Sequence, residues 1–266
     1  MKNQLIGLVL LWAAGFNQAP AQDVCQEFST WFQANRSVAD PATAYRSELI
    51  SRGLTEAEAG KRFAELFRGV LSCPQFAVVP FDSLYGSDKE SSLAEPDPFL
   101  VECTKDVKPG RALDVAMGQG RNALYLAKAG WEVTGFDVSD EGLAVARRDA
   151  GRAGVKVNAV LKSYDAFDYG TAQWDLIVIT YEPFPLTDAD YVKRLENALR
   201  PGGLIVIESF ASDATARGRR PVDIDPAELR RAFAEFRIVR FEDAEEVPDW
   251  DPQKTRLVRM VAEKRR

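Results

Sequence analysis

The chain of 266 residues contains no histidine. This absence excludes catalytic schemes that use an imidazole base, and it excludes a zinc site with histidine ligands. The chain has 34 lysines and arginines against 40 aspartates and glutamates, which gives a net charge of −6. Nucleic-acid affinity comes mainly from neutralising phosphates with basic side chains, so an acidic chain is a poor candidate for such a partner. We therefore expect neither a metal site nor nucleic-acid binding.

Long apolar runs are scarce as well. The run Leu5–Phe16 has about a dozen residues, whereas a membrane-spanning helix needs about 20. It follows Lys2 and precedes Ala19-Pro20-Ala21, which has the A-x-A form of a signal-peptide cleavage site. We expect residues 1–21 to be a signal peptide, and the mature chain to be periplasmic or secreted without a stable membrane span. Without cleavage, the protein would instead be membrane-anchored or cytoplasmic.

Only three cysteines occur, and two of them bracket a segment with helical patterning. Residues 22–74 repeat apolar side chains at helical spacing, and Thr55 with Glu58 has the spacing of a capping box. We expect this segment to be a helical N-terminal module. A disulfide between Cys25 and Cys73 is the expectation if the chain is exported, because disulfides persist in oxidising compartments.

Residues 75–97 are rich in proline, serine, aspartate and glycine, which is typical of an irregular connector and of a segment that could form a lid. From residue 98 to 266, strand-like and helix-like runs alternate. The expected strands are Ala112–Ala116, Glu132–Val138, Val157–Leu161, Trp174–Thr180, Leu204–Glu208, Phe236–Phe241 and Arg256–Ala262. No helical crossover fits between the last two. The predicted fold class is therefore α/β, a Rossmann-like sheet of seven mainly parallel strands with an antiparallel last pair.

A glycine turn stands in the stretch LDVAMGQGRNALYLAKAG, residues 113–130. Gly118 and Gly120 end the first expected strand and open a helix, and with Ala123 they satisfy the pattern G-x-G-x-x-G/A. Such a turn lets a ligand approach the backbone and presents N–H groups to it. Asp137 ends the second strand, where an acid can bind both hydroxyls of a ribose. Nicotinamide, flavin and S-adenosylmethionine enzymes share this arrangement.

Two further acids distinguish among these cofactors. Asp114 lies inside the first strand, and a buried carboxylate there needs a partner such as a ligand ammonium, which a pyrophosphate would not provide. Asp165 follows the third strand, where an acid could accept a hydrogen bond from an adenine amino group. The alternative is that the glycines only shape a turn and that the acids only cap helices.

Three stretches, in this order and spacing, resemble the class I S-adenosylmethionine-dependent methyltransferases: GRALDVAMGQGRNALYLAKAGWEVTGFDVS, WDLIVITYEPFP and LRPGGLIVIESF. The most similar subgroup includes the bacterial tellurite-resistance and thiopurine-type enzymes. The resemblance extends from Pro98 to the C-terminus and leaves the N-terminal helices aside. It implies S-adenosylmethionine as the cofactor.

The resemblance also implies where the cofactor lies. The residues that it assigns to S-adenosylmethionine are Asp114, Gly118, Gly120, Asp137, Val138, Asp165, Ala166 and Thr180. The two glycines would approach its methionine part, with Asp114 supporting the amino group. Asp137 would bind the ribose hydroxyls and Val138 would flank the adenine. Asp165 and Ala166 would meet the adenine edge, with Asp168 as an alternative, and Thr180 would lie close to the transferable methyl.

Methyl transfer is an in-line displacement that depends on alignment and exclusion of water, so it tolerates the absence of histidine. The candidate catalytic residues are Tyr181 and Glu182, which stand where some relatives carry an Asn/Asp-Pro-Pro-Tyr motif for amino groups. The departure from that motif argues against amide or nucleobase nitrogen as the acceptor. Glu182 could act as a base or orient a hydroxyl or amine if burial raised its pKa. The alternative is a solvated loop acid.

We expect a small-molecule methyl acceptor. Two alternatives remain open from the sequence. The first is a nucleoside-binding or interaction module that lacks turnover. The second is a nicotinamide- or flavin-linked oxidoreductase, against which Asp114 and the antiparallel last strands speak.

Overall fold

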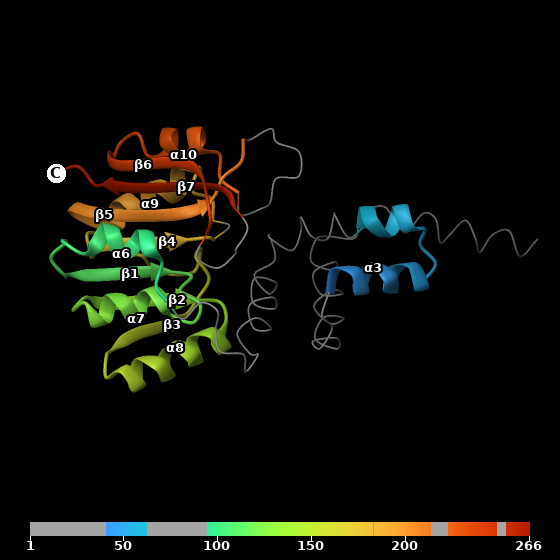
Figure 1. Ribbon diagram of the computed structural model, residues 1–266, viewed down its shortest axis with the longest axis horizontal. Helices are drawn as coiled ribbons and strands as arrows, with labels where there is room; N and C mark the ends of the chain where they lie inside the picture. The colour runs from blue at the N-terminus through green and yellow to red at the C-terminus, as the bar shows by residue number, and fades with distance from the viewer. Residues whose placement is uncertain (1–40, 63–94, 183, 214–222, 249–253) are drawn as a thin grey trace, which may run out of the picture. The chain divides into compact units, whose positions relative to one another are not determined.

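The computed structural model describes residues 41–62, 95–182, 184–213, 223–248 and 254–266 (Figure 1). They belong to two compact units, residues 1–83 and residues 84–266, which we describe separately. Among the helices of these ranges, none combines the length and the apolar character that crossing a membrane requires. The expected signal peptide, Cys25, Cys73 and nearly all of the expected connector lie outside the described residues.

The described part of the first unit is helical. Helix α3 spans Pro41–Ser51, and residues 56–62 are helical as well. The predicted capping box is confirmed, since the Thr55 amide donates to the Glu58 carboxylate (2.9 Å) and the Glu58 amide donates to the Thr55 hydroxyl (3.3 Å). The remainder of the module expected over residues 22–74 lies outside the described residues.

The second unit is built on a seven-stranded sheet in the order β3-β2-β1-β4-β5-β7-β6. Its strands are β1 (Arg111–Val115), β2 (Glu132–Asp137), β3 (Val157–Leu161), β4 (Trp174–Thr180), β5 (Leu199–Phe210), β6 (Arg237–Glu246) and β7 (Thr255–Glu263). Strands β1 to β5 are parallel to one another. Strand β7 lies between β5 and β6 and is antiparallel to both. The predicted fold class is thus confirmed, including the antiparallel last pair.

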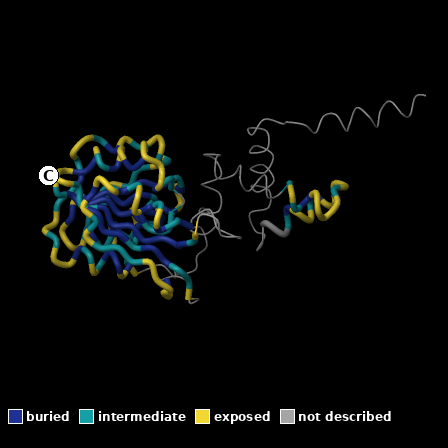
Figure 2. Tube along the Cα trace, turned by 90° about the horizontal axis from the view of Figure 1, so that it is seen from above, coloured by how far each residue is buried: buried dark blue, intermediate teal, exposed yellow. Residues whose placement is uncertain are grey.

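Helices cover both faces of this sheet (Figure 1). On one face lie α6 (Pro98–Thr104), α7 (Arg121–Lys128) and α8 (Asp140–Ala153); on the other lie α9 (Ala189–Ala198) and α10 (Pro226–Ala232). The caps explain where these helices begin. The Ser139 hydroxyl accepts the Gly142 amide at the start of α8, and the Asp188 carboxylate accepts the Tyr191 amide at the start of α9. Figure 2 shows the buried strands enclosed by exposed helical surfaces.

Two strands, β5 and β6, are several residues longer than the sequence predicts, and β7 gains one residue at each end. Strand β5 begins at Leu199 rather than Leu204, because a register shift against β4 admits the Pro-Gly-Gly segment and the Gly202 amide donates to the Lys264 carbonyl (2.9 Å). Strand β6 continues to Glu246 rather than ending at Phe241. Arginines on β7 form cross-strand ion pairs with acidic residues of this extension, as Arg256 does with Asp243 at 2.6 Å.

The glycine turn after β1 packs on β2 through one side chain. Met117 is buried in that turn, and a Cβ at Gly135 of β2 would lie 2.0 Å from its sulfur and 2.9 Å from its Cγ. Gly135 is not among the residues with positive φ, so space rather than backbone conformation requires glycine there. The absent side chain in β2 therefore sets how deeply the turn lies on the sheet.

We predict that Gly135→Ala lowers the free energy of unfolding by about 1–3 kcal/mol through overpacking. In a Met117→Ala background the added methyl group has room, so the same substitution should cost much less. Urea denaturation of the two single variants and the double variant measures this coupling. Equal costs in both backgrounds would contradict the packing explanation.

Candidate active site

The site lies at the carboxyl ends of β1, β2 and β4. The chain runs from β1 outward to β2 and β3, then crosses to β4 on the other side of β1. Ligands of open α/β sheets bind at such a topological switch point, in the crevice beyond the carboxyl ends of the strands. The glycine turn after β1 is at this place.

The glycine turn has an unusual backbone. Ala116 (φ 53), Gly118 (φ 52) and Gly120 (φ 79) all adopt the left-handed conformation. Gly120 is the N-cap residue of α7, and a Cβ there would lie 2.8 Å from the Ala146 Cβ of α8. Both the conformation and the close helix packing therefore require glycine at position 120. The turn brings its backbone, rather than a side chain, to the edge of the crevice.

Asp137 locks this turn to the end of β2. The Gly118 amide donates to its Oδ2 (2.8 Å), and the Ser139 amide donates to its Oδ1 (2.8 Å). Burial raises the pKa of Asp137, and the two amide donors offset part of this shift. Each carboxylate oxygen can accept more than one hydrogen bond, so the side chain can still accept from ligand hydroxyls.

Asp114 is the most unusual acid of the site. It is 2 % exposed, and its Oδ2 has no hydrogen-bond partner among the described residues. Burial raises its pKa to about 7; Asp137 and Asp97 add to the shift, whereas Arg121 and the Ala123 amide oppose it. An orphaned buried carboxylate oxygen beside a glycine turn fits a ligand ammonium, as the sequence predicts.

Asn122 joins three segments around the crevice, and the sequence analysis missed it. Its Oδ1 accepts the Asp97 amide (2.9 Å), and its Nδ2 donates to the Thr180 hydroxyl (3.2 Å). Thr180 is the last residue of β4. The sequence carries a signal for this role. Asn122 is a polar residue on the buried, otherwise apolar face of α7, and a buried polar side chain needs hydrogen-bond partners.

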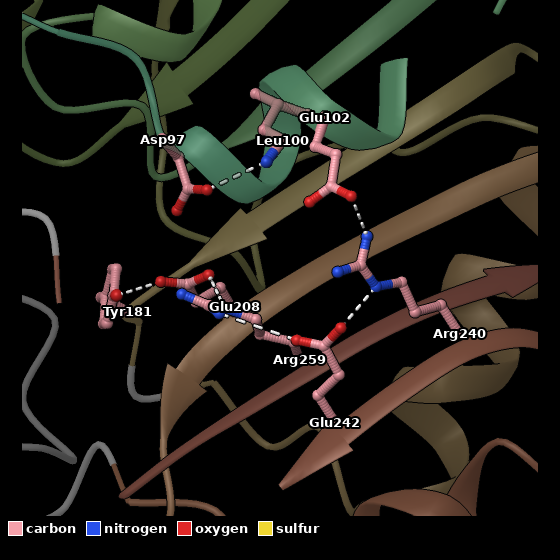
Figure 3. Close-up of polar contacts among 8 residues, drawn as sticks. All are labelled: Asp97, Leu100, Glu102, Tyr181, Glu208, Arg240, Glu242 and Arg259. Atoms are coloured by element: carbon pink, nitrogen blue, oxygen red, sulfur yellow. Dashed lines mark hydrogen bonds and ion pairs between the residues drawn. The ribbon is translucent and has the colours of Figure 1, made fainter. Parts of the chain in front are cut away.

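Tyr181 begins the segment after β4 in a constrained conformation. Its φ is 57, and its amide donates to the Glu208 carbonyl of β5 (2.8 Å). Its hydroxyl donates to the Glu208 carboxylate, which is 1 % exposed (Figure 3). The other carboxylate oxygen of Glu208 accepts from the Arg259 guanidinium of β7 (2.5 Å). A buried ion pair therefore holds the ring of Tyr181.

This ion pair belongs to a row of charges that crosses the sheet (Figure 3). The register places Thr180, Glu208, Arg259 and Glu242 opposite one another on β4, β5, β7 and β6. Glu242 accepts from Arg240 (2.5 Å), which also pairs with Glu102 of α6 (2.9 Å). The row connects α6 to the sheet through the pair of Arg240 with Glu102, and it places Arg259 between Glu208 and Glu242. Neither arginine was predicted, because the pairs of Arg259 depend on strand register and the pair of Arg240 with Glu102 depends on how α6 packs on the sheet.

Glu182 follows Tyr181 and is half-buried, not fully exposed. Burial raises its pKa well above the ordinary value, and the carboxylates of Asp137 and Asp114 raise it further. No hydrogen bond to its carboxylate occurs within the described part of the chain. The register pairs Ile179 of β4 with Val115 of β1, so Glu182, three residues later, follows β4 at the edge where β1 ends. The described residues contain no group of three or more histidines, cysteines or acids that could hold a metal ion.

The residues expected around the adenine are arranged less tightly. Val138 is half-buried, whereas Asp165 and Ala166 are exposed in the turn after β3. A hydrogen bond from Ser163 holds the pKa of Asp165 below its usual range, and no described contact joins Asp165 to the other site residues. Asp168 accepts the Gly170 amide (2.9 Å). The predicted residues that the structure gathers are Asp114, Gly118, Gly120, Asp137, Thr180, Tyr181 and Glu182.

Comparison with known proteins agrees with this geometry. Residues 112–203 match the profile of a methyltransferase domain family. The chain is 27% identical over 165 residues to "Hemagglutinin 1" of Eikenella corrodens, covering 59% of this chain and 53% of that protein. It is 30% identical over 81 residues to the probable S-adenosyl-L-methionine-dependent methyltransferase TehB of Haemophilus influenzae, covering 30% and 28%. The chain thus spans about half, or less, of the length of these relatives.

Among solved structures, the fold is similar to a 1,6-didemethyltoxoflavin-N1-methyltransferase of Burkholderia thailandensis with bound S-adenosylhomocysteine. The TM-score is 0.57 at 24% identity, covering 75% of this chain and 89% of that one. At this identity the likeness concerns the fold. Together with the domain profile that residues 112–203 match and with the glycine turn, it supports the fold of a class I methyltransferase for the second unit.

Proposed function

We propose that this protein transfers a methyl group from S-adenosylmethionine to a small-molecule acceptor. The observation that carries the proposal is the buried Asp114 carboxylate, whose Oδ2 has no partner in the described chain and which lies next to a left-handed glycine turn. Burying a carboxylate without a partner is costly, so a site of this kind is expected to acquire one from a ligand. The amino group of the cofactor's methionine part is such a partner.

The other residues of the crevice suit the rest of the cofactor. Asp137 retains acceptor capacity for ribose hydroxyls, and Gly118 and Gly120 allow close approach of the backbone. When bound, S-adenosylmethionine supplies a methyl group activated by its positively charged sulfur. Val138, Asp165 and Ala166 are proposed to border the adenine.

On the acceptor side we propose Glu182 and Tyr181. Burial raises the pKa of Glu182, which makes its carboxylate a stronger proton acceptor, and the residue lies two positions beyond the end of β4. The Tyr181 hydroxyl donates a hydrogen bond to Glu208. Its oxygen can therefore accept a hydrogen bond from an N–H or O–H group of the small molecule that is methylated. Similar proteins named ubiquinone biosynthesis O-methyltransferase and 1,6-didemethyltoxoflavin-N1-methyltransferase support a small-molecule acceptor.

We also propose that the protein is exported after cleavage near Gln22, on the strength of the charged, apolar and A-x-A segments of residues 1–21. Intact mass of protein recovered outside the cytoplasm of its native host should show the loss of these residues. If Cys25 and Cys73 are bridged, the same mass should be lower by two hydrogens. A full-length product with three alkylatable thiols would contradict both expectations.

The role of Asp137 can be tested by binding alone. We predict that Asp137→Ala weakens S-adenosylmethionine binding by one or two charge-assisted hydrogen bonds, roughly 1.5–3 kcal/mol each. Isothermal titration calorimetry measures this, with NAD as a ligand that the wild-type protein should not bind. Thermal unfolding is the control, because Asp137 also holds the Gly118 and Ser139 amides. Unchanged affinity in a folded variant would remove Asp137 from the site.

The raised pKa of Asp114 predicts a pH dependence of binding. A ligand ammonium stabilises the carboxylate, so binding should release a proton, and affinity should rise as the pH rises toward about 7. Asp137 and Asp97 add to the shift, and Arg121 reduces it. Calorimetry between about pH 5.5 and pH 7 should show this rise in the wild type and a flatter profile in Asp114→Asn. Identical profiles would contradict an ammonium contact with Asp114.

A further inference from the structure

The acids at this edge of the sheet are compensated in two different ways. Glu208 is buried with its own arginine, since Arg259 donates to it at 2.5 Å and also approaches Glu242 at 3.6 Å. Asp114, Asp137 and Glu182 form no ion pair with any lysine or arginine of the described residues; Arg121 acts on Asp114 only electrostatically. The carboxyl ends of β1, β2 and β4 thus bring three carboxyl groups to one edge of the sheet, and the described residues pair no cation with them.

The three carboxyl groups differ in what could satisfy them. Asp114 has one orphaned oxygen in a fully buried position, which an ammonium would complete. Asp137 already accepts two backbone amides and can accept hydroxyls in addition. Glu182 has no hydrogen-bond donor within the described chain, and its interactions there are with the other two acids. A second positive charge on the ligand, separate from the ammonium that completes Asp114, would stabilise the ionised carboxylate of Glu182.

The end of β4 holds Glu182 close to the glycine turn. Thr180, two residues earlier, accepts from Asn122 of the first turn of α7 (3.2 Å). The intervening Tyr181 is held by Glu208 at both its amide and its hydroxyl. Glu182 is therefore carried by a backbone anchored on both β5 and α7, and its charge acts on the same crevice as Asp114 and Asp137.

From this arrangement we infer that Glu182 makes the cofactor site selective for ligands with a positive charge at the methyl-bearing centre, so that it binds S-adenosylmethionine more tightly than S-adenosylhomocysteine. The inference rests on the proposed function. The two ligands share the ammonium, the carboxylate, the ribose and the adenine, and they differ in the sulfonium charge with its methyl group. Glu182 would thus favour the loaded state before transfer and weaken retention of the neutral product.

Binding of three probes tests the inference without any methyl acceptor. The probes are S-adenosylmethionine, S-adenosylhomocysteine and sinefungin, in which a protonated amine replaces the methylated sulfur. We expect both cationic ligands to bind about tenfold or more tightly than S-adenosylhomocysteine, a difference consistent with one partly screened charge pair. In Glu182→Gln the three affinities should converge to within about threefold. Because only the ionised carboxylate of Glu182 attracts the cationic ligands, the preference should also increase as the pH rises in the wild type, but not in Glu182→Gln.

A matched control separates Glu182 from acids in general. Asp165→Asn removes an exposed carboxylate at the same edge of the sheet, and any effect there should be equal for the three ligands. Tighter binding of S-adenosylhomocysteine by the wild type, or an unchanged preference in a folded Glu182→Gln protein, would overturn the inference. Both results would leave the proposed function intact. Absence of binding by all three ligands would instead contradict the proposed function and this inference together.

Discussion

The hydrogen bond from the Gly118 amide to Asp137 joins the two strands between which the site is built. It requires the chain to leave β1 through left-handed conformations at Ala116, Gly118 and Gly120. The second oxygen of the same carboxylate accepts the Ser139 amide, where α8 begins. One acid thereby positions the glycine turn and the start of the next helix. Because its partners are backbone amides, this wall of the crevice depends little on side-chain rotamers.

Two buried acids at this edge of the sheet, Glu208 and Asp114, have different partners. Glu208 is completed internally by Arg259 and Tyr181, and loss of one partner of such a pair would leave an uncompensated buried charge. Asp114 is left incomplete, with its pKa raised to about 7. The first arrangement stabilises the strands β4, β5 and β7 against one another. The second leaves a buried carboxylate oxygen without a partner among the described residues. Such unsatisfied groups are typical of binding sites, whereas structural ion pairs are satisfied within the protein.

Most of the fold could be predicted from the sequence, because apolar strands alternating with helices determine the sheet and the absence of a crossover determines its reversed strand. The glycine turn and its acids were predictable for the same local reasons. The row from Thr180 to Glu242 was not, since Glu208 and Arg259 lie 51 residues apart and meet only through strand register. The extension of β6 to Glu246 depends on the same register, which supplies arginines opposite its acids.

Because the chain contains no histidine, other side chains must carry any proton transfer at this site. A protein that moves protons near neutral pH normally relies on imidazole, whose ordinary pKa lies in that range. This chain has none, and its site instead contains carboxyl groups whose pKa values burial raises, with Asp114 at about 7 and Glu182 well above its ordinary value. Mutual repulsion among the acids adds to the effect of burial. Burial and proximity thus raise the pKa values of acids at this site, with that of Asp114 reaching about 7, and a cationic ligand can relieve their repulsion.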